Sequence, residues 1–118
     1  MPPVEFSENN LYLLAHVICG EAQNCDRKEQ EYVGSVVLNR VASNRFPNTL
    51  EEVLYQPGQY ACTWDGNYSK EPTELNWEVA EYLLKNGSVL PGDVVWQSAE
   101  FQGTYLYEDT GWHKYCGG

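Results

Sequence analysis

Apolar residues near the start of the chain recur at three- and four-residue steps, which is the spacing of one buried helical face. Ser7 is a suitable N-cap for this helix, because its hydroxyl can accept a hydrogen bond from an unpaired amide of the first turn. Glu21 falls roughly 80° from the centre of the apolar stripe, so we expect it at the margin of the buried face. The stripe comprises Leu11, Leu14, Ala15, Ile18 and Ala22.

A second helix is predicted to begin after Asp26, which forms a capping-box pattern with Glu29. Its apolar stripe has Arg40 almost at the centre, and a guanidinium there must be paired or extend to solvent. We therefore expect Arg40 either to hold a carboxylate or to run along the helix end toward water. Gly34 either allows another element to approach closely or is simply tolerated. The stripe comprises Val33, Val36, Val37 and Val41.

Two further helices are predicted after the proline that ends the second one. Asn48 or Thr49 is expected to cap a short helix that continues to about Tyr55. Thr73 is expected to cap a longer amphipathic helix that continues to Asn86 and stops at the following glycine. The chain therefore has four predicted helices, of which the third is the shortest.

The remaining segments do not have helical periodicity. Residues 56–72 are rich in Pro, Gly, Asn and aromatic residues, and we expect an irregular or hairpin structure with a turn at Asp65-Gly66. The runs VVWQSAEF and TYLYE are predicted to be two strands joined around Gln102-Gly103. The predicted architecture is one domain over residues 1–118, α+β and mainly α, with a small β element.

The length, net charge and hydrophobic pattern of the chain disfavour several classes of function. The 118 residues suffice for one hydrophobic core, and 17 acidic against 7 basic residues give a net charge of −10. A nucleic-acid-binding protein needs a basic surface, so nucleic acid and anionic membrane surfaces are both disfavoured as partners. The opening residues, MPPVEF, do not resemble a signal peptide, and no apolar run approaches the ~20 residues of a membrane helix.

The cysteines leave several possibilities open. Four cysteines allow three disulfide pairings, at Cys19, Cys25, Cys62 and Cys116. A zinc site could use Cys19 and Cys25 together with His16, but no cysteine pair has the close spacing typical of such sites. Free buried thiols, or one disulfide, agree better with the spacing. We expect no metal and no cofactor.

Three motifs occur in order along the chain: GEA at residues 20–22, VVLNRV at 36–41, and FPNTLEEVLYQPGQY at 46–60. Together with the closing GWHKYC they resemble the cell wall hydrolase family of the spore-cortex-lytic enzymes (SleB/CwlJ type). The resemblance covers about Leu11 to Cys116 and implies a lysozyme-like fold. It also implies that Glu21 is the catalytic acid. Many members carry a second Glu four residues later, where this chain has Cys25.

Substrate-binding residues are expected mainly in the irregular segment, because loops on a rigid scaffold commonly carry binding groups. Tyr60 occupies the family's aromatic position in the GQ-aromatic motif. The aromatic residues could instead belong to the core, and Asp65 could serve only its turn. Gln97 and His113 complete the set, and His113 lies in the closing motif. The candidates in the irregular segment are Gln59, Tyr60, Thr63, Trp64 and Asp65.

The predicted chemistry is cleavage of peptidoglycan glycan strands, which requires a proton for the leaving oxygen. A carboxyl at the margin of a buried face is partly desolvated, so we expect a raised pKa for Glu21, as a general acid needs. The resemblance implies a lytic transglycosylase, in which the substrate's N-acetyl group and 6-hydroxyl replace a second carboxylate and a 1,6-anhydro product forms. It also implies action in the cell wall, the spore or the extracellular space.

Three alternatives remain. The first is ordinary hydrolysis, with Asp65 or Glu100 positioning water. The second is a non-catalytic glycan-binding module that uses aromatic residues. The third is a cysteine enzyme with Cys62 and His113, for which no nucleophile signature is present.

Overall fold

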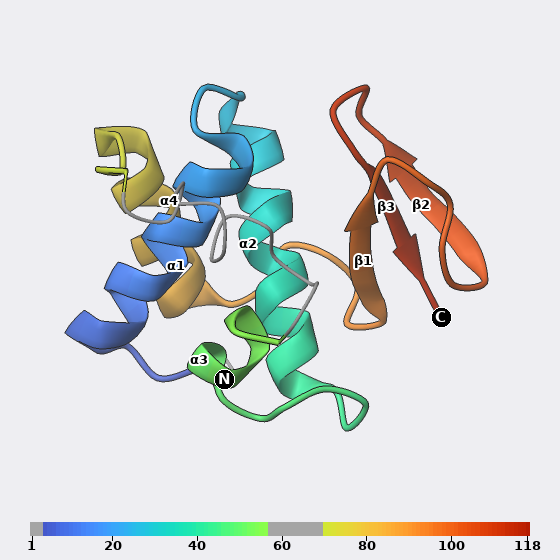
Figure 1. The fold of residues 1–118 in the computed structure, drawn as a ribbon, viewed down its shortest axis with the longest axis horizontal. Coiled ribbons are helices and arrows are strands. Elements are labelled where there is room, and N and C mark those ends of the chain that lie inside the picture. The colour runs from blue at the N-terminus through green and yellow to red at the C-terminus, as the bar shows by residue number, and fades with distance from the viewer. Residues whose placement is uncertain (1–3, 57–69) are drawn as a thin grey trace.

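The computed structural model describes residues 4–56 and 70–118. A group of helices lies on one side of the molecule and a small sheet on the other, with α2 between them (Figure 1). The fold is therefore α+β and mainly α, as the sequence predicts. The elements are α1 (Glu8–Ala22), α2 (Arg27–Ala42), α3 (Leu50–Leu54), α4 (Glu74–Asn86), β1 (Val94–Ser98), β2 (Tyr105–Asp109) and β3 (Lys114–Gly117).

Each of the four helices in the described part of the chain begins at a polar cap. The cap side chain accepts a hydrogen bond from the backbone amide three residues later, which satisfies one of the unpaired donors of the first turn. The predicted helix starts are thereby confirmed, with Thr49 rather than Asn48 as the cap of α3. The four caps are Ser7, Asp26, Thr49 and Thr73.

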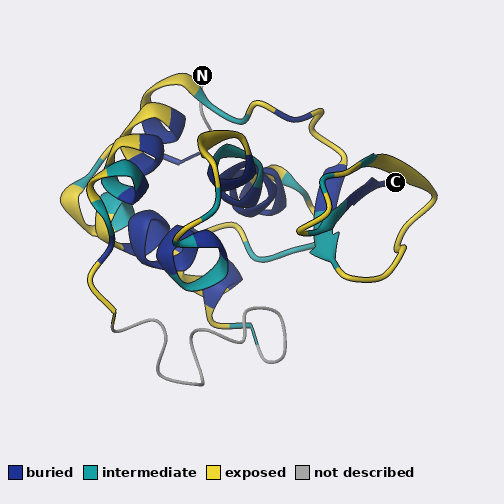
Figure 2. Ribbon diagram, turned by 90° about the horizontal axis from the view of Figure 1, so that it is seen from above, coloured by how far each residue is buried: buried dark blue, intermediate teal, exposed yellow. Residues whose placement is uncertain are grey.

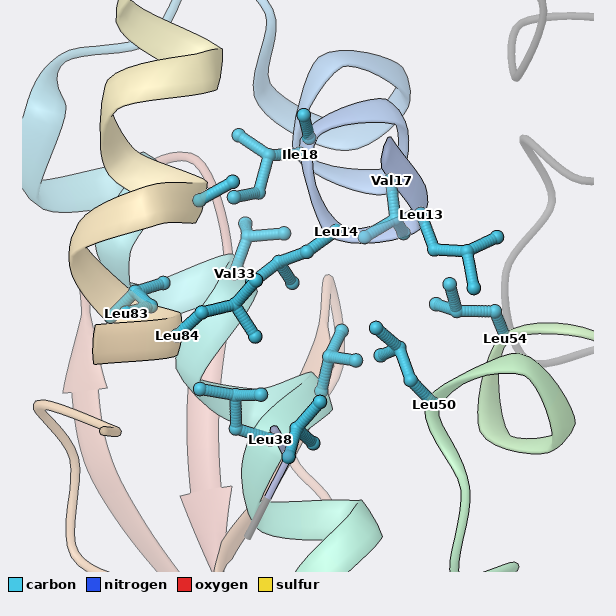
Figure 3. Packing of buried hydrophobic residues seen from close by; sticks show 14 of the residues in the cluster. Leu13, Leu14, Val17, Ile18, Val33, Leu38, Leu50, Leu54, Leu83 and Leu84 are labelled. Atoms are coloured by element: carbon cyan, nitrogen blue, oxygen red, sulfur yellow. The ribbon is translucent and has the colours of Figure 1, made fainter. Parts of the chain in front are cut away.

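The main core lies where the four helices meet (Figure 3). Leu14 and Ile18 from α1 pack with Val33 from α2 and Leu83 from α4, and all four side chains are fully buried. Gly34 explains how closely these helices approach. A Cβ added there would overlap Leu83 and lie 3.2 Å from Ile18 Cδ1. The glycine therefore permits the close approach that was one of its two predicted roles.

Helix α1 is buried on more sides than its apolar stripe predicts. Of the stripe, Leu11 is only partly buried, whereas Leu13, Val17 and Cys19 outside the stripe are buried. The reason is that α1 packs against α2, α3 and α4, so it is surrounded instead of lying on a surface. Figure 2 shows this concentration of buried residues in the helical part. Among the described residues, no helix has the length and apolarity needed to cross a membrane.

The sheet differs from the predicted pair of strands. Its order is β1-β3-β2, and both pairings are antiparallel, so the strand at Lys114–Gly117 separates the two that were expected to be joined around Gln102-Gly103. Both predicted strands are present and are connected through Gln102-Gly103, but they do not pair with each other, because the middle position is taken by β3, whose Tyr115 and Cys116 are fully buried. The run KYCG at 114–117 does not alternate between apolar and polar residues, so its pattern does not predict a strand. Strand β1 is also shorter than the run VVWQSAEF, since it ends at Ser98.

Polar side chains of α2 hold the sheet against the helices. Asn39 Nδ2 donates to the carbonyl oxygens of Pro91 at 2.8 Å and Val94 at 3.0 Å. Arg40 Nε donates to the carbonyl oxygen of Val95 at 2.7 Å, and its guanidinium lies 4.8 Å from the centre of the Phe46 ring. Arg40 is 4% exposed, so the alternative expectation, that its side chain extends along the helix end to solvent, is wrong. That it holds a carboxylate stays a prediction.

Candidate active site

Glu21 lies in the last turn of α1, where the helix approaches the sheet. Its side chain is partly buried, and Gln97 Nε2 from β1 lies 3.4 Å from Glu21 Oε1. Among the described residues, the buried Oε1 of Gln97 has no hydrogen-bond partner. The two residues that the sequence analysis assigns to catalysis and substrate binding are therefore neighbours. Gln97 also retains an acceptor that a bound N–H or O–H group could use.

A second carboxylate, Glu29, lies below the surface at the start of α2. It is 1% exposed, and its Oε2 receives two contacts from the C-terminal part of the chain. His113 Nδ1 lies 2.8 Å from this oxygen, and the hydroxyl of Tyr115 donates to it at 2.6 Å. Short bonds to an ionised acceptor are among the stronger hydrogen bonds in proteins. Glu29 therefore joins α2 to the C-terminal segment through two different side chains.

Tyr115 is the largest fully buried side chain among the described residues. Its ring packs edge-on against Tyr32, with the ring centres 5.0 Å apart. Burial raises the pKa of its phenol most strongly, and donation to Glu29 adds to the effect, as do the negative charges of Glu29 and Glu21. The phenol therefore stays protonated at all ordinary pH values. It also lies within electrostatic reach of both acids.

Two polar contacts of Glu108, with Tyr32 and with Lys28, join β2 to α2. The hydroxyl of Tyr32 donates to Glu108 Oε1 at 2.8 Å, and Lys28 Nζ pairs with Glu108 Oε2. The bond from Lys28 is the main reason that the pKa of Glu108 is lowered, and the bond from Tyr32 adds to it. Burial is the main reason that the pKa of Tyr32 is raised. Together these contacts fix the outer strand of the sheet.

A small pocket is lined by His113, by its neighbours around the connection between β2 and β3, and by Ala99 after β1. Its volume is about 130 Å³, and one of its lining residues, Trp112, is 61% exposed. Lys114 also lines the pocket. Its Nζ donates to the carbonyl oxygen of Ala99 at 3.1 Å and lies 3.7 Å from Asp109 Oδ2. An exposed indole beside polar groups suits a sugar ring, which has apolar faces and a polar edge.

Several predicted site residues cannot be placed. Those of the irregular segment, Gln59, Tyr60, Thr63, Trp64 and Asp65, lie outside the described residues, as does Cys62. Their assigned roles stay predictions. Glu100 is exposed and follows β1 in a loop.

The zinc alternative used His16, Cys19 and Cys25. His16 Nδ1 lies 2.7 Å from the carbonyl oxygen of Tyr12, and its ring stacks on that of Tyr12. The thiol of Cys19 is directed toward the carbonyl oxygens of Lys70 and Glu71. Residues 4–56 and 70–118 contain no cluster of three ligating side chains suited to a metal ion. Cys19, Cys25 and Cys116 are free thiols.

The contacts of Glu29, Tyr115 and Trp112 were not predicted from the sequence. Glu29 was predicted to complete a capping box, and the amide half of that box is present, with Glu29 N donating to Asp26 Oδ1 at 2.9 Å. The carboxylate is directed instead to His113 and Tyr115, so the second half of the box is wrong. A signal was available, because Glu29 lies four residues before Val33 and so continues the buried stripe of α2.

The family can now be determined from sequence. Residues 26–96, more than half of the chain, match a family described as Cell Wall Hydrolase. The chain belongs to the Cell Wall Hydrolase family. The match begins at Asp26 and ends at Trp96, so it includes Glu29 and excludes Glu21, Gln97 and His113. The family resemblance stated from the motifs is confirmed.

Relatives in this family include two spore cortex-lytic enzymes. Those of Bacillus cereus and Bacillus subtilis (strain 168) are each 35% identical to the chain over 72 residues, which is 61% of the chain. The matched part covers 28% of the first enzyme and 24% of the second. The chain thus matches about a quarter of the length of these Cell Wall Hydrolase relatives.

Two solved structures have the same fold. The catalytic domain of the Bacillus cereus SleB protein has a TM-score of 0.81 and 23% sequence identity, covering 98% of this chain and 97% of that domain. The catalytic domain of the germination-specific lytic transglycosylase SleB from Bacillus anthracis has a TM-score of 0.79 at 23% identity, covering 94% and 96%. The described part of the chain therefore has the fold of these two domains.

Proposed function

We propose that this protein cleaves the glycan strands of peptidoglycan, with Glu21 as the general acid. The observation that carries the proposal is the position of Glu21, partly buried at the end of α1 with Gln97 beside it. Family membership and the names of the relatives, which are cortex-lytic enzymes, support the same activity. The relatives also support action in the cell wall of the spore.

The reaction begins when Glu21 transfers its proton to the glycosidic oxygen, which leaves with the bonding electron pair. The substrate's own N-acetyl oxygen stabilises the positive charge that develops at the anomeric carbon. Glu21, now ionised, accepts the proton of the 6-hydroxyl as that oxygen attacks the anomeric carbon. The bond that forms closes a 1,6-anhydro ring, and Glu21 regains its proton.

Gln97 supports this step through both polar atoms of its side-chain amide. Its amide nitrogen is directed toward the Glu21 carboxylate, which keeps the acid oriented. Its Oε1 can accept from a donor group of the sugar, since it is buried and has no partner among the described residues. A sugar N–H or hydroxyl bound there would hold the glycosidic oxygen near Glu21.

The test is Glu21→Gln, which preserves the shape of the side chain but cannot transfer a proton. Turnover of purified peptidoglycan is expected to fall by roughly 10² to 10⁴, the usual contribution of a general acid–base residue. The free energy of unfolding should change little, because a neutral amide is no harder to desolvate than a carboxylate. Glu8→Gln is the matched control, since it removes the same charge at the far end of the same helix.

Mass spectrometry of the products separates the possible reactions. An anhydro product, lighter than a reducing sugar by about one water, is expected from the unmutated protein. A reducing-end product together with an inactive Glu21→Gln variant would mean hydrolysis, and would direct attention to Asp65 and Glu100. Full turnover by a folded Glu21→Gln variant would refute the proposal. Binding of peptidoglycan without turnover by the unmutated protein would leave a glycan-binding module.

A further inference from the structure

Glu29 is a buried ionisable group to which the proposed chemistry gives no role. It is 1% exposed, and every contact of its carboxylate described above is made with the C-terminal segment rather than with its own helix. Removing a carboxylate from water is unfavourable unless strong partners replace the water. One of its two partners, His113, lines the small pocket, and the other, Tyr115, is paired in the sheet with Gln97, which lies 3.4 Å from Glu21.

Both contacts converge on one oxygen. A carboxylate oxygen has two lone pairs, so Glu29 Oε2 can accept from the Tyr115 hydroxyl at 2.6 Å and from His113 Nδ1 at 2.8 Å at the same time. For His113 to donate through Nδ1, the neutral ring must carry its proton there. Nε2 is then left as an acceptor on the opposite edge of the ring.

The Nε2 edge of His113 is the part of the ring that a ligand could meet. The side chain is 22% exposed, and His113 lines the pocket of about 130 Å³ beside the exposed indole of Trp112. The ring is further held by Tyr115, whose ring centre lies 6.0 Å away in an edge-on arrangement. The contact with Glu29 therefore bears on which nitrogen of His113 is available in the pocket beside Trp112.

We propose that Glu29 is a positioning residue of the glycan site: it fixes the Nδ1–H tautomer of His113, so that Nε2 accepts from a hydroxyl or amide N–H of a sugar seated against Trp112. This inference rests on the proposed function and extends it by assigning a sugar-binding role to the pocket. Glu29 acts through His113 and does not touch the substrate. Its second contact holds the Tyr115 phenol in place between the sheet and α2.

The first measurement is the tautomer of His113 in the unmutated protein. Long-range ¹H–¹⁵N correlation spectra at a pH where the ring is neutral distinguish a protonated Nδ1 from a protonated Nε2. The chain has two histidines, and a His113→Gln variant assigns the signals. An Nδ1–H ring is expected. An Nε2–H ring at position 113 would overturn the proposal, and this result does not depend on the folding of any Glu29 variant.

The second measurement compares Glu29→Gln with Glu31→Gln. The amide introduced by Glu29→Gln would present an N–H group as well as an oxygen to two donors, so the His113 tautomer is expected to shift toward Nε2–H. Loss of this orientation should lower turnover of peptidoglycan by roughly 10- to 100-fold. Glu31 lies on the same helix and pairs with Arg27 at the surface. Glu31→Gln removes the same charge, so the His113 tautomer and the turnover of peptidoglycan should both stay unchanged in that variant.

These outcomes separate the two proposals. Unchanged turnover in a folded Glu29→Gln variant, with Glu21→Gln inactive, would overturn the role of Glu29 and leave the proposed function in place. Activity in Glu21→Gln would remove the proposed function, whereas the tautomer spectra would still report on the contact. Tyr115→Phe removes one donor and leaves the His113 contact, so the Nδ1–H signal should persist in that variant.

Discussion

At the scale of single residues, Glu108 connects the charge state of one carboxyl group to the stability of the fold. Its contacts with Lys28 and Tyr32 join β2 to α2, and they lower its pKa from the ordinary value. A group whose pKa is lower in the folded state contributes stability above its unfolded-state pKa. That contribution is lost as the pH falls through the folded-state pKa.

We therefore expect Glu108→Gln to reduce the free energy of unfolding at pH 7, and the difference from the parent to shrink as the pH falls below about 4. The measurement is urea denaturation of both proteins between about pH 7 and about pH 3, a range that spans the ordinary pKa of a Glu side chain. Glu5→Gln, a change at an exposed residue that precedes α1, should follow the parent throughout. A difference between Glu108→Gln and the parent that is equally large at both ends of this range would contradict the explanation.

Candidate site residues could be named from the sequence where a motif marked them. Glu21 was named from the GEA motif together with its place at the margin of an apolar stripe, and Gln97 lies 3.4 Å from it, while the catalytic and binding roles of the two stay predictions. Glu29 was assigned to a cap, because a capping pattern explains a Glu at that position without reference to distant parts of the chain. Its partners are 84 and 86 residues away, and no local rule reports such a contact.

At the scale of elements, the packing of α1 and α4 against α2 depends on Gly34. A methyl group at this position would overlap Leu83 and press on Ile18, which are both fully buried. Interiors are packed too densely to absorb even one extra carbon without displacement. The small residue thus sets the separation of three helices.

Gly34→Ala is expected to destabilise the protein by about 1–2 kcal/mol, because overpacking in a core costs roughly 1–3 kcal/mol and the higher helix propensity of Ala offsets part of that. Gly92→Ala is the matched control, because a Cβ there meets nothing within 4 Å. Thermal or urea unfolding measures both. Equal stabilities of the two variants would show that the helices can separate without cost.

The helices were more predictable than the sheet, for a physical reason. Helix starts are fixed by contacts across three residues, so Ser7, Asp26 and Thr73 could be recognised as caps from the sequence. The pairing of strands is fixed by contacts between distant segments. Trp96 and Leu106 are both opposite Cys116, an arrangement that no spacing between the first two strands encodes.

At the scale of the whole molecule, the net charge of −10 bears on how the protein meets its proposed substrate. Bacterial wall polymers are themselves anionic, so long-range repulsion opposes the encounter. The contacts within the site, in contrast, are short and are screened little by salt. Charge should therefore affect how often the enzyme reaches the wall more than what happens there.

We expect turnover of intact, anionic walls to rise as salt is raised from about 0.01 M to about 0.1 M, over which the screening length falls from about 30 Å to about 10 Å. The gain should appear in kcat/KM and leave kcat nearly unchanged. A short, uncharged glycan fragment is the control substrate and should be insensitive to salt in this range. A fall in kcat/KM on intact walls would show that attraction, from a local surface, dominates the encounter.

The middle position of β3 has a consequence for the order in which the protein assembles. Both ladders of the sheet run through β3, so β1 and β2 remain single, unpaired segments until Lys114–Gly117 docks between them. The pairings β1·β3 and β2·β3 then form in the same event as the contacts of His113 and Tyr115 with Glu29. The helical part has its own large core and can collapse earlier. We therefore expect the sheet pairings and the contacts of Glu29 to form late and in one step, so that the helices alone would lack the proposed sugar site beside Trp112.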